Sequence, residues 1–387
     1  MDWGWLILGV WTFLTVGSSS AAFVPPTPAE CLRAIGATGD LPPVLRRAFQ
    51  PDDDFQIVPA PGPHDWLAEH SQAGQSFRDF AKARPRRPDK SRNKIYLLPL
   101  GEFPEDRSPA IGKLAAYAAA YFGLEVQTLA SVKLTEWELT TRTNRYTHKR
   151  QILAADVLRM LTGRLPADGF CLCAVTMEDL YPHPSWNFVF GQASPQNGVG
   201  VYSFARYDPA FYGGQRGGDY QKVLLRRSCR VLVHEVGHLF GLEHCVFFRC
   251  VMNGSNHLQE SDSRPLHVCP VCLRKLHYSI GFDPAERYKA LGDFYQRTGM
   301  QDEAQWVANR LKWITAGEAG ETPGAARSAS RSRMLWSRRT SRHSTWTAST
   351  DRASPTIGRQ DIVQRLSDGS VAAAVALLVN AETREQK

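Results

Sequence analysis

Apolar residues between positions 94 and 315 recur in two patterns, short continuous runs and longer stretches with helical spacing. The short runs predict five strands: Ile95–Leu100, Leu124–Val132, Phe170–Thr176, Trp186–Gly191 and Gly198–Phe204. The longer stretches predict five helices: Ala110–Phe122, Arg150–Leu165, Tyr220–Phe240, Ala285–Arg297 and Asp302–Trp313. Because strands alternate with helices, the pattern favours an α/β fold built on a mostly parallel, twisted sheet.

The chain on either side of this span is expected to be less ordered. Residues 23–93 are rich in Pro, Asp and Arg, and we expect a loosely ordered N-terminal segment ahead of a catalytic domain at 94–315. Residues 316–387 begin with a long stretch dominated by Ser, Arg, Thr, Gly and Ala. Such a composition cannot bury enough apolar surface to fold, so this basic tail is expected to be disordered.

The first residues carry an apolar run, Leu6–Val16, followed by small residues up to Ala22. This pattern is typical of a secretory signal peptide, and residues 1–22 are a candidate for one. Asp2 and the absence of an early Lys or Arg argue against it, and the run is too short to predict a membrane span. The protein is expected to be secreted if this segment is a signal peptide, and cytoplasmic or nuclear otherwise.

The formal net charge of +8 arises almost entirely in the tail. Residues 327–359 hold eight arginines and one acid, Asp351, so they contribute +7 of that charge. The rest of the chain is close to neutral, and no nucleic-acid partner is expected. Four of the eight cysteines lie within 28 residues, which fits a metal site better than a disulfide framework.

The most specific feature of the chain is the sequence HEVGHLFGLEH, which begins at His234. Residues four apart lie on one face of a helix, so His234 and His238 can bind one ion together. Gly241 can adopt a positive φ without steric cost, which allows the chain to leave the helix and return with His244 as a third ligand. Three protein ligands leave a fourth position open for water or a substrate carbonyl, the arrangement of a catalytic zinc.

Glu235 is predicted to be the general base of this site. It is one residue from His234, which places its carboxylate beside the metal, where it can take a proton from a zinc-bound water. The ion would lower the pKa of that water towards about 7 and polarise the scissile carbonyl. The motif therefore predicts a zinc metallopeptidase that cleaves peptide bonds with zinc-activated water.

A second metal site is predicted immediately after the histidines. Four thiolates in two pairs suit a closed tetrahedral zinc, and they would come from Cys245, Cys250, Cys269 and Cys272. Reduced buried cysteines or disulfides are the alternative. Met252 fits a Met-turn, an apolar floor below the histidines, although an ordinary core methionine would have the same spacing. Two zinc ions per chain are expected, one catalytic and one structural.

The sequence HEVGHLFGLEHC, followed by Cys250, Met252 and CPVC, resembles the archaemetzincin (archaelysin) family of metallopeptidases. The motifs cover about Val233–Leu276, and the segments EDLYPHPSWNFVF and GVYSFARY extend the likeness back to about Lys94. The resemblance implies a metzincin-type α/β fold with an active-site helix, a four-cysteine zinc subsite, and aminopeptidase-like activity on small peptides. It also implies that an extended substrate pairs with an edge strand above the zinc, for which Trp186–Gly191 is the candidate.

Two other functions are compatible with the sequence. One is a catalytically inert, zinc-stapled binding protein, although Glu235 and all three histidines are retained. The other is a zinc-finger-like nucleic-acid binder that uses the basic tail, but Arg249, Arg274 and Lys275 are too few to form a basic face around the cysteines. A peptide or protein substrate is the expected partner. The sequence leaves open the physiological substrate, exo- versus endopeptidase action and the oligomeric state.

Overall fold

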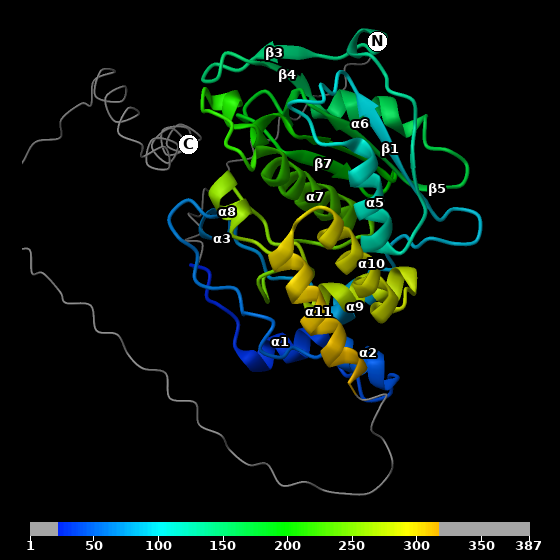
Figure 1. The fold of residues 1–387 in the computed structure, drawn as a ribbon. Coiled ribbons are helices and arrows are strands. Elements are labelled where there is room, and N and C mark those ends of the chain that lie inside the picture. Colours follow the sequence, from blue (N-terminus) through cyan, green and yellow to red (C-terminus); the bar gives the residue numbers. More distant parts are fainter. Residues whose placement is uncertain (1–21, 317–387) are drawn as a thin grey trace, which may run out of the picture.

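The structure is built on a five-stranded sheet that is parallel except at one edge (Figure 1). The computed structural model describes residues 22–316. The strand order is β2-β1-β5-β8-β7, with β1 Lys94–Leu100, β2 Val126–Thr128, β5 Gly169–Thr176, β7 Gly191–Ser194 and β8 Val199–Ser203. β7 runs antiparallel to β8 and forms one edge. A smaller sheet has the order β3-β4-β6, with β3 Thr141–Thr143, β4 Arg150–Leu153 and β6 Asp179–Tyr181. The predicted α/β fold with a mostly parallel sheet is confirmed.

Helices cover both faces of the large sheet. The α-helices that follow β1 are α5 Ile111–Phe122, α6 Ala154–Thr162, α7 Tyr220–Leu239, α8 Leu258–Asp262, α9 Pro270–Ile280, α10 Pro284–Arg297 and α11 Gln301–Thr315. Short 3-10 helices are η1 Leu134–Glu136, η2 Ala205–Tyr207 and η3 Pro209–Tyr212. Side chains alternate along each strand, so Leu97 and Cys173 pack in the core that holds α5 and α7, whereas Leu98 and Leu172 pack with α6.

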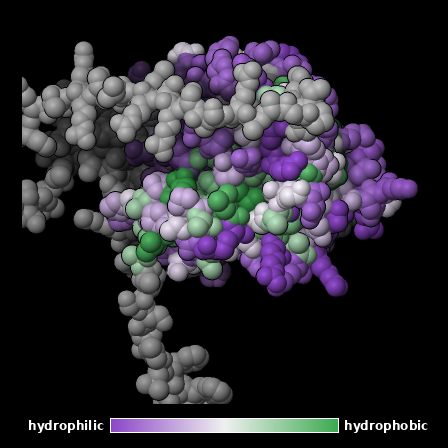
Figure 2. Space-filling model, turned by 90° about the horizontal axis from the view of Figure 1, so that it is seen from below, coloured by the Kyte–Doolittle hydropathy of each residue, from purple (hydrophilic) through white to green (hydrophobic). Residues whose placement is uncertain are grey.

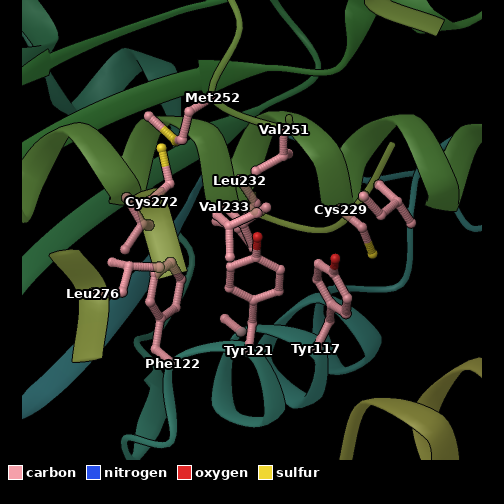
Figure 3. Close-up of a cluster of buried hydrophobic side chains, with 14 of the residues drawn as sticks. Tyr117, Tyr121, Phe122, Cys229, Leu232, Val233, Val251, Met252, Cys272 and Leu276 are labelled. Atoms are coloured by element: carbon pink, nitrogen blue, oxygen red, sulfur yellow. The ribbon is translucent and has the colours of Figure 1, made fainter. Parts of the chain in front are cut away.

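The core between α5 and α7 is rich in aromatic side chains (Figure 3). Tyr117, Tyr121 and Phe122 of α5 point towards α7, where Leu232 and Val233 lie. All five side chains are buried, and burial of a large apolar side chain stabilises a fold by roughly 1.5–3 kcal/mol. This packing fixes α7, the helix that carries the first two predicted zinc ligands.

The predicted strand Trp186–Gly191 is wrong in its position, because the edge strand β7 begins only at Gly191. The carbonyl of Asn187 accepts hydrogen bonds from the side chains of Arg142 (2.8 Å) and Gln151 (3.0 Å). Side chains from distant segments thus provide the hydrogen bonds that a neighbouring strand would otherwise provide to this carbonyl. An apolar run in the sequence does not reveal such contacts.

Two other predicted elements are shorter in the structure. The first four residues of the predicted helix Arg150–Leu165 form β4, and the helix begins at Ala154. Ile152 is buried in the small sheet between β3 and β6, and this tertiary pairing overrides the helical spacing. The predicted strand Leu124–Val132 is reduced to the three residues of β2.

The N-terminal segment at 23–93 is ordered, where loose order was expected. It contains α1 Pro28–Ile35, α2 Pro43–Ala48, α3 Trp66–Glu69 and α4 Phe77–Lys82. Capping boxes begin two of these helices, formed by Thr27 with Glu30 and by Ser76 with Asp79. Its apolar side chains join the main core, among them Cys31, Ile35, Phe49, Phe55 and Phe80. They are separated by prolines and charged residues, so no periodic pattern marks them in the sequence.

Hydrophobic surface gathers near the middle of the face seen from below, within a hydrophilic margin (Figure 2). Across residues 22–316, no helix has the length and apolar character needed to cross a membrane. The candidate signal peptide lies outside the described residues except for Ala22, and the basic tail lies outside them except for Ala316.

Candidate active site

Helix α7 brings His234 and His238 together in a cleft of about 800 Å³. The two residues are about one helical turn apart, and their Nε2 atoms are 3.1 Å from each other. In a tetrahedral zinc site the nitrogen ligands lie about 2.0–2.1 Å from the ion and therefore roughly 3.3 Å from one another. The two imidazoles are thus placed to share one ion.

The chain reverses after α7 and returns a third histidine to the same place. Gly241 has a φ of +85°, a left-handed conformation that favours glycine. The ring centroid of His244 then lies 5.3 Å from that of His234 and 5.1 Å from that of His238. One ligand atom from each of the three residues lies within 4.8 Å of the others. The three candidate ligands therefore converge.

Backbone carbonyls orient two of these rings. Nδ1 of His234 donates to the carbonyl of Val251 (2.8 Å), and Nδ1 of His238 donates to that of Leu242 (2.6 Å). Since the proton is on Nδ1 in each ring, Nε2 keeps a free lone pair. Burial lowers the pKa of His234 and His238 below the ordinary value, and that of His244 to about 3. Three neutral imidazoles with converging nitrogens fit a zinc ion.

Glu235 faces the same cleft and lies against the edge strand. Its side chain is buried, and a Cβ on Gly191 would be only 2.9 Å from its carboxyl carbon, so glycine at the start of β7 makes room for it. No described residue donates a hydrogen bond to its carboxylate. Burial raises the pKa of Glu235 to about 8, and a cation held by the histidines would oppose that shift. A buried carboxylate without a partner beside metal ligands is suited to proton transfer.

Met252 lies under the turn of α7 that bears the first two histidines. A Cβ on Gly237 would be 2.6 Å from its sulfur, so the thioether packs directly on the helix backbone. Met252 is buried, and its carbonyl accepts a hydrogen bond from the amide of Cys245 (2.8 Å). The same short loop thus contacts the histidine helix on one side and the cysteine cluster on the other (Figure 3).

The four clustered cysteines form a compact buried group, and their Sγ atoms all lie within 4.8 Å of one another. Sγ of Cys245 is 3.5 Å from Sγ of Cys269, much longer than the disulfide bond of about 2.05 Å and close to the roughly 3.8 Å between thiolates in a tetrahedral zinc site. Hydrogen bonds with the neighbouring thiols lower the pKa of Cys245, whereas burial raises the pKa of Cys269. Four converging thiols fit a zinc ion better than they fit disulfides.

The N-terminal segment also lines the cleft, and two of its residues there contact His244, both of which sequence reasoning missed. The ring of Trp66 packs edge-on against His244, with centroids 4.8 Å apart. The side-chain amide of Gln72 lies 3.2 Å from Nδ1 of His244, and its oxygen is buried without a partner. Exchanging the amide oxygen and nitrogen would let Gln72 accept the Nδ1 proton and leave Nε2 of His244 free for a metal. A single Trp and Gln in a proline-rich stretch carry no spacing signal.

Known proteins resemble the chain over most of its length. Residues 155–278 match the model of peptidase family M54. Archaemetzincin-2 of Pongo abelii is 40% identical over 310 residues, which cover 73% of this chain and 81% of that protein. Human archaemetzincin-2 is 39% identical over 310 residues, with the same coverage of both chains. The crystal structure of archaemetzincin from Archaeoglobus fulgidus has 29% identity and a TM-score of 0.37, and covers 47% of this chain and 99% of that one. The chain therefore belongs to the archaemetzincin family, and it is a zinc metallopeptidase.

Proposed function

We propose that this cleft hydrolyses peptide bonds of small peptides in an aminopeptidase-like manner. His234, His238 and His244 would hold a catalytic zinc, and Glu235 would act as general base. The observation that carries the proposal is the convergence of three neutral imidazoles and one unpartnered carboxylate on a single open cleft. The aminopeptidase-like part rests on the family resemblance alone.

The chain's own groups would divide the chemistry between them. Zinc bound at the histidines would supply Lewis-acid chemistry, because it acidifies water and polarises a carbonyl. A carboxylate oxygen of Glu235 would take the proton of the attacking water and pass it to the leaving amine. The carbonyls of Val251 and Leu242 would keep the histidines in the tautomer that binds metal.

The four-cysteine cluster would hold a second, structural zinc, giving two ions per chain. As thiolates, the four buried cysteines would close the coordination sphere of that ion and leave no position for substrate. We assign the catalytic unit to a metzincin-type domain at 94–315, with Met252 as its Met-turn. Trp66 and Gln72 add a wall to the cleft from the preceding segment.

An extended substrate would pair with the open edge of β7. The carbonyl of Phe190 accepts a hydrogen bond from the amide of Ser203 (2.8 Å), and bonding alternates from residue to residue along an antiparallel ladder. The peptide groups of Gly191 and Ala193 are therefore directed away from β8. Both residues line the cleft, where their backbone groups can pair with a peptide.

Replacing Ala193 with proline is expected to raise KM by about fivefold to tenfold, because it removes one backbone donor from this edge. Proline is tolerated on an edge strand when its position faces outwards, so the protein should stay folded. Gln192→Pro is the matched control: the same alternation directs its amide to β8, and the substitution should lower the melting temperature. Steady-state kinetics and thermal denaturation measure both effects. Unchanged kinetics in a folded Ala193→Pro protein would place the substrate on another segment.

The proposed activity can be tested by incubating zinc-loaded protein with a library of short peptides and reading the products by mass spectrometry. We expect stepwise loss of N-terminal residues that stops with a chelator and returns when zinc is added. Internal cleavage would contradict the aminopeptidase-like part. Intact peptides in the presence of zinc-loaded protein would instead support the inert binding protein.

A further inference from the structure

One end of the cleft is formed by a buried arginine, Arg264, together with Ser255 and Ser261. All three follow Met252 in the chain and belong to the segment that includes α8. The residue Arg264 is 9% exposed and lines the cleft that also holds Glu235. A guanidinium is therefore placed within the cleft and almost entirely shielded from bulk water.

Arg264 differs from the other buried arginines in having neither a counter-charge nor an aromatic ring beside it. The structure buries five arginines within residues 22–316. Three pair with aspartates: Arg206 with Asp179 (2.8 Å), Arg230 with Asp262 (3.2 Å) and Arg310 with Asp52 (2.7 Å). A fourth lies over aromatic rings: Arg287 over Tyr121, Phe282 and Tyr288. For Arg264, the described residues supply neither a carboxylate in ion-pair contact nor an aromatic ring.

Arg264 donates hydrogen bonds only to uncharged groups, and some of its guanidinium N–H donors remain unused. Nη1 donates to the carbonyl of Asn253, and Nη2 donates to the hydroxyls of Ser255 (2.8 Å) and Ser261 (2.9 Å). Nε is buried and has no partner. A guanidinium has five N–H donors, so three contacts leave two donors free. An unpaired charge and unused donors in a shielded site are costly unless something else binds them.

Nearby acids do not neutralise this group directly. Glu260 accepts hydrogen bonds from the backbone amides of Trp66 (2.9 Å) and Asn256 (2.7 Å), and is not in ion-pair contact with Arg264. Burial, followed by the charge of Arg230, lowers the pKa of Arg264 to about 10, so it stays protonated at neutral pH. Arg264 therefore keeps its positive charge at the cleft with no carboxylate in ion-pair contact, and the charges of Glu260 and Glu235 act on it only from a distance.

We propose that Arg264 is a specificity residue that binds a carboxylate of the peptide substrate. The carboxylate is either an Asp or Glu side chain or the peptide's own C-terminus, since both offer the two oxygens that a guanidinium fork accepts. The inference rests on the proposed peptidase function, whose zinc ligands and base share the cleft with Arg264. The serines hold the guanidinium in place, and the bound carboxylate supplies the missing counter-charge.

The test is a scan of Ala-based hexapeptides in which one Glu or one Gln is moved through every position, with free or amidated C-termini. At one position we expect kcat/KM to be about tenfold higher for Glu than for Gln, the effect of a charge-assisted hydrogen bond. If the C-terminus is the ligand, amidation rather than Gln produces the loss. A wild-type protein with less than about twofold preference in every comparison overturns the proposal.

Arg264 also supports the backbone at Asn253, so a variant could lose activity for structural reasons. The ratio of kcat/KM between the acidic peptide and its neutral counterpart separates substrate binding from structural support, because a damaged fold lowers both values alike. In Arg264→Gln the preference should fall to about twofold or less, and Arg264→Lys should keep part of it. Arg310→Gln is the matched control, a buried arginine that pairs with Asp52 outside the cleft lining, and should leave the ratio unchanged. A preference that persists in folded Arg264→Gln overturns the proposal.

A binding measurement separates this inference from the catalytic assignment. Calorimetry on the Glu235→Ala protein with the preferred acidic peptide and its amide counterpart requires no turnover. We expect the acidic peptide to bind about tenfold more tightly, and the difference to vanish when Arg264→Gln is added. Equal affinities would overturn the role of Arg264 even if the peptidase activity is demonstrated. A clear preference would support it even if the cleft proves to bind peptides without cleaving them.

Discussion

Replacing Glu235 with alanine is expected to lower kcat by about 10³-fold or more while the zinc stays bound. General-base catalysis contributes about 10²–10⁴-fold, and a 10³-fold loss corresponds to about 4 kcal/mol of transition-state stabilisation. The zinc should remain because the carboxylate is not among the converging imidazole ligands. The fold should also remain, since no described residue loses a hydrogen-bond partner with that carboxylate. Activity assays combined with metal analysis of the dialysed protein measure both outcomes.

His238→Ala provides the comparison, because it removes a proposed ligand rather than the base. It should lose both the activity and the catalytic zinc, so that the two variants differ in metal content but not in rate. Glu235→Gln keeps the size of the side chain and should be as inactive as Glu235→Ala. A Glu235→Ala protein with substantial turnover would show that another group carries the proton.

The histidine motif could be predicted from the sequence because its geometry depends on local offsets. Residues i and i+4 of one helix must lie on one face, and Gly241 alone permits the reversal that returns His244. The cysteine cluster is similar, since Cys269 and Cys272 lie at the N-terminus of one helix, α9. Spacing along the sequence sets the positions of these candidate ligands within each segment, and the fold then has to bring the segments together.

Other parts of the cleft depend on contacts between distant segments, and no spacing encodes them. Gln72 contacts His244 across a separation of 172 residues. The sequence predicts the edge strand a few residues too early, because it does not show that the side chains of Arg142 and Gln151 bind the backbone at Asn187. Arg264 looks like any other arginine in the sequence, and its lack of an acidic partner appears only when burial and neighbours are known.

The two proposed metal sites share one loop, so we expect the binding of zinc at one site to depend on the other. His244 and Cys245 are adjacent in the chain, so their Cα atoms are about 3.8 Å apart. The carbonyl of Val251 holds His234, and its neighbour Met252 accepts the amide of Cys245. The side chain of Asn253 closes this loop by donating to the carbonyl of Cys245 (2.7 Å) and accepting from the amide of Cys250 (2.7 Å). A zinc held by the four cysteines would therefore anchor both the third histidine and the carbonyl that orients the first.

Cys272→Ser is accordingly expected to weaken the histidine site although it lies outside it. Ordering the backbone costs about 1–2 kcal/mol per residue, whereas binding of a structural zinc is worth about 10–16 kcal/mol in small domains. Without that zinc, the free energy that offsets the cost of ordering the loop is lost. We expect zinc content to fall from about two ions per chain to one or fewer, and activity at limiting zinc to fall about tenfold or more, with partial rescue by excess zinc.

The measurement is a chelator titration that follows activity and metal content together. Cys171→Ser is the matched control, a buried thiol in β5 outside the cluster, and it should keep wild-type zinc content and chelator resistance even if it lowers stability. Circular dichroism of both variants excludes general unfolding as the cause. If Cys272→Ser loses one zinc yet retains wild-type activity and chelator resistance, the shared loop does not couple the sites. Its hydrogen bonds alone would then suffice to hold His244 and Val251 in place.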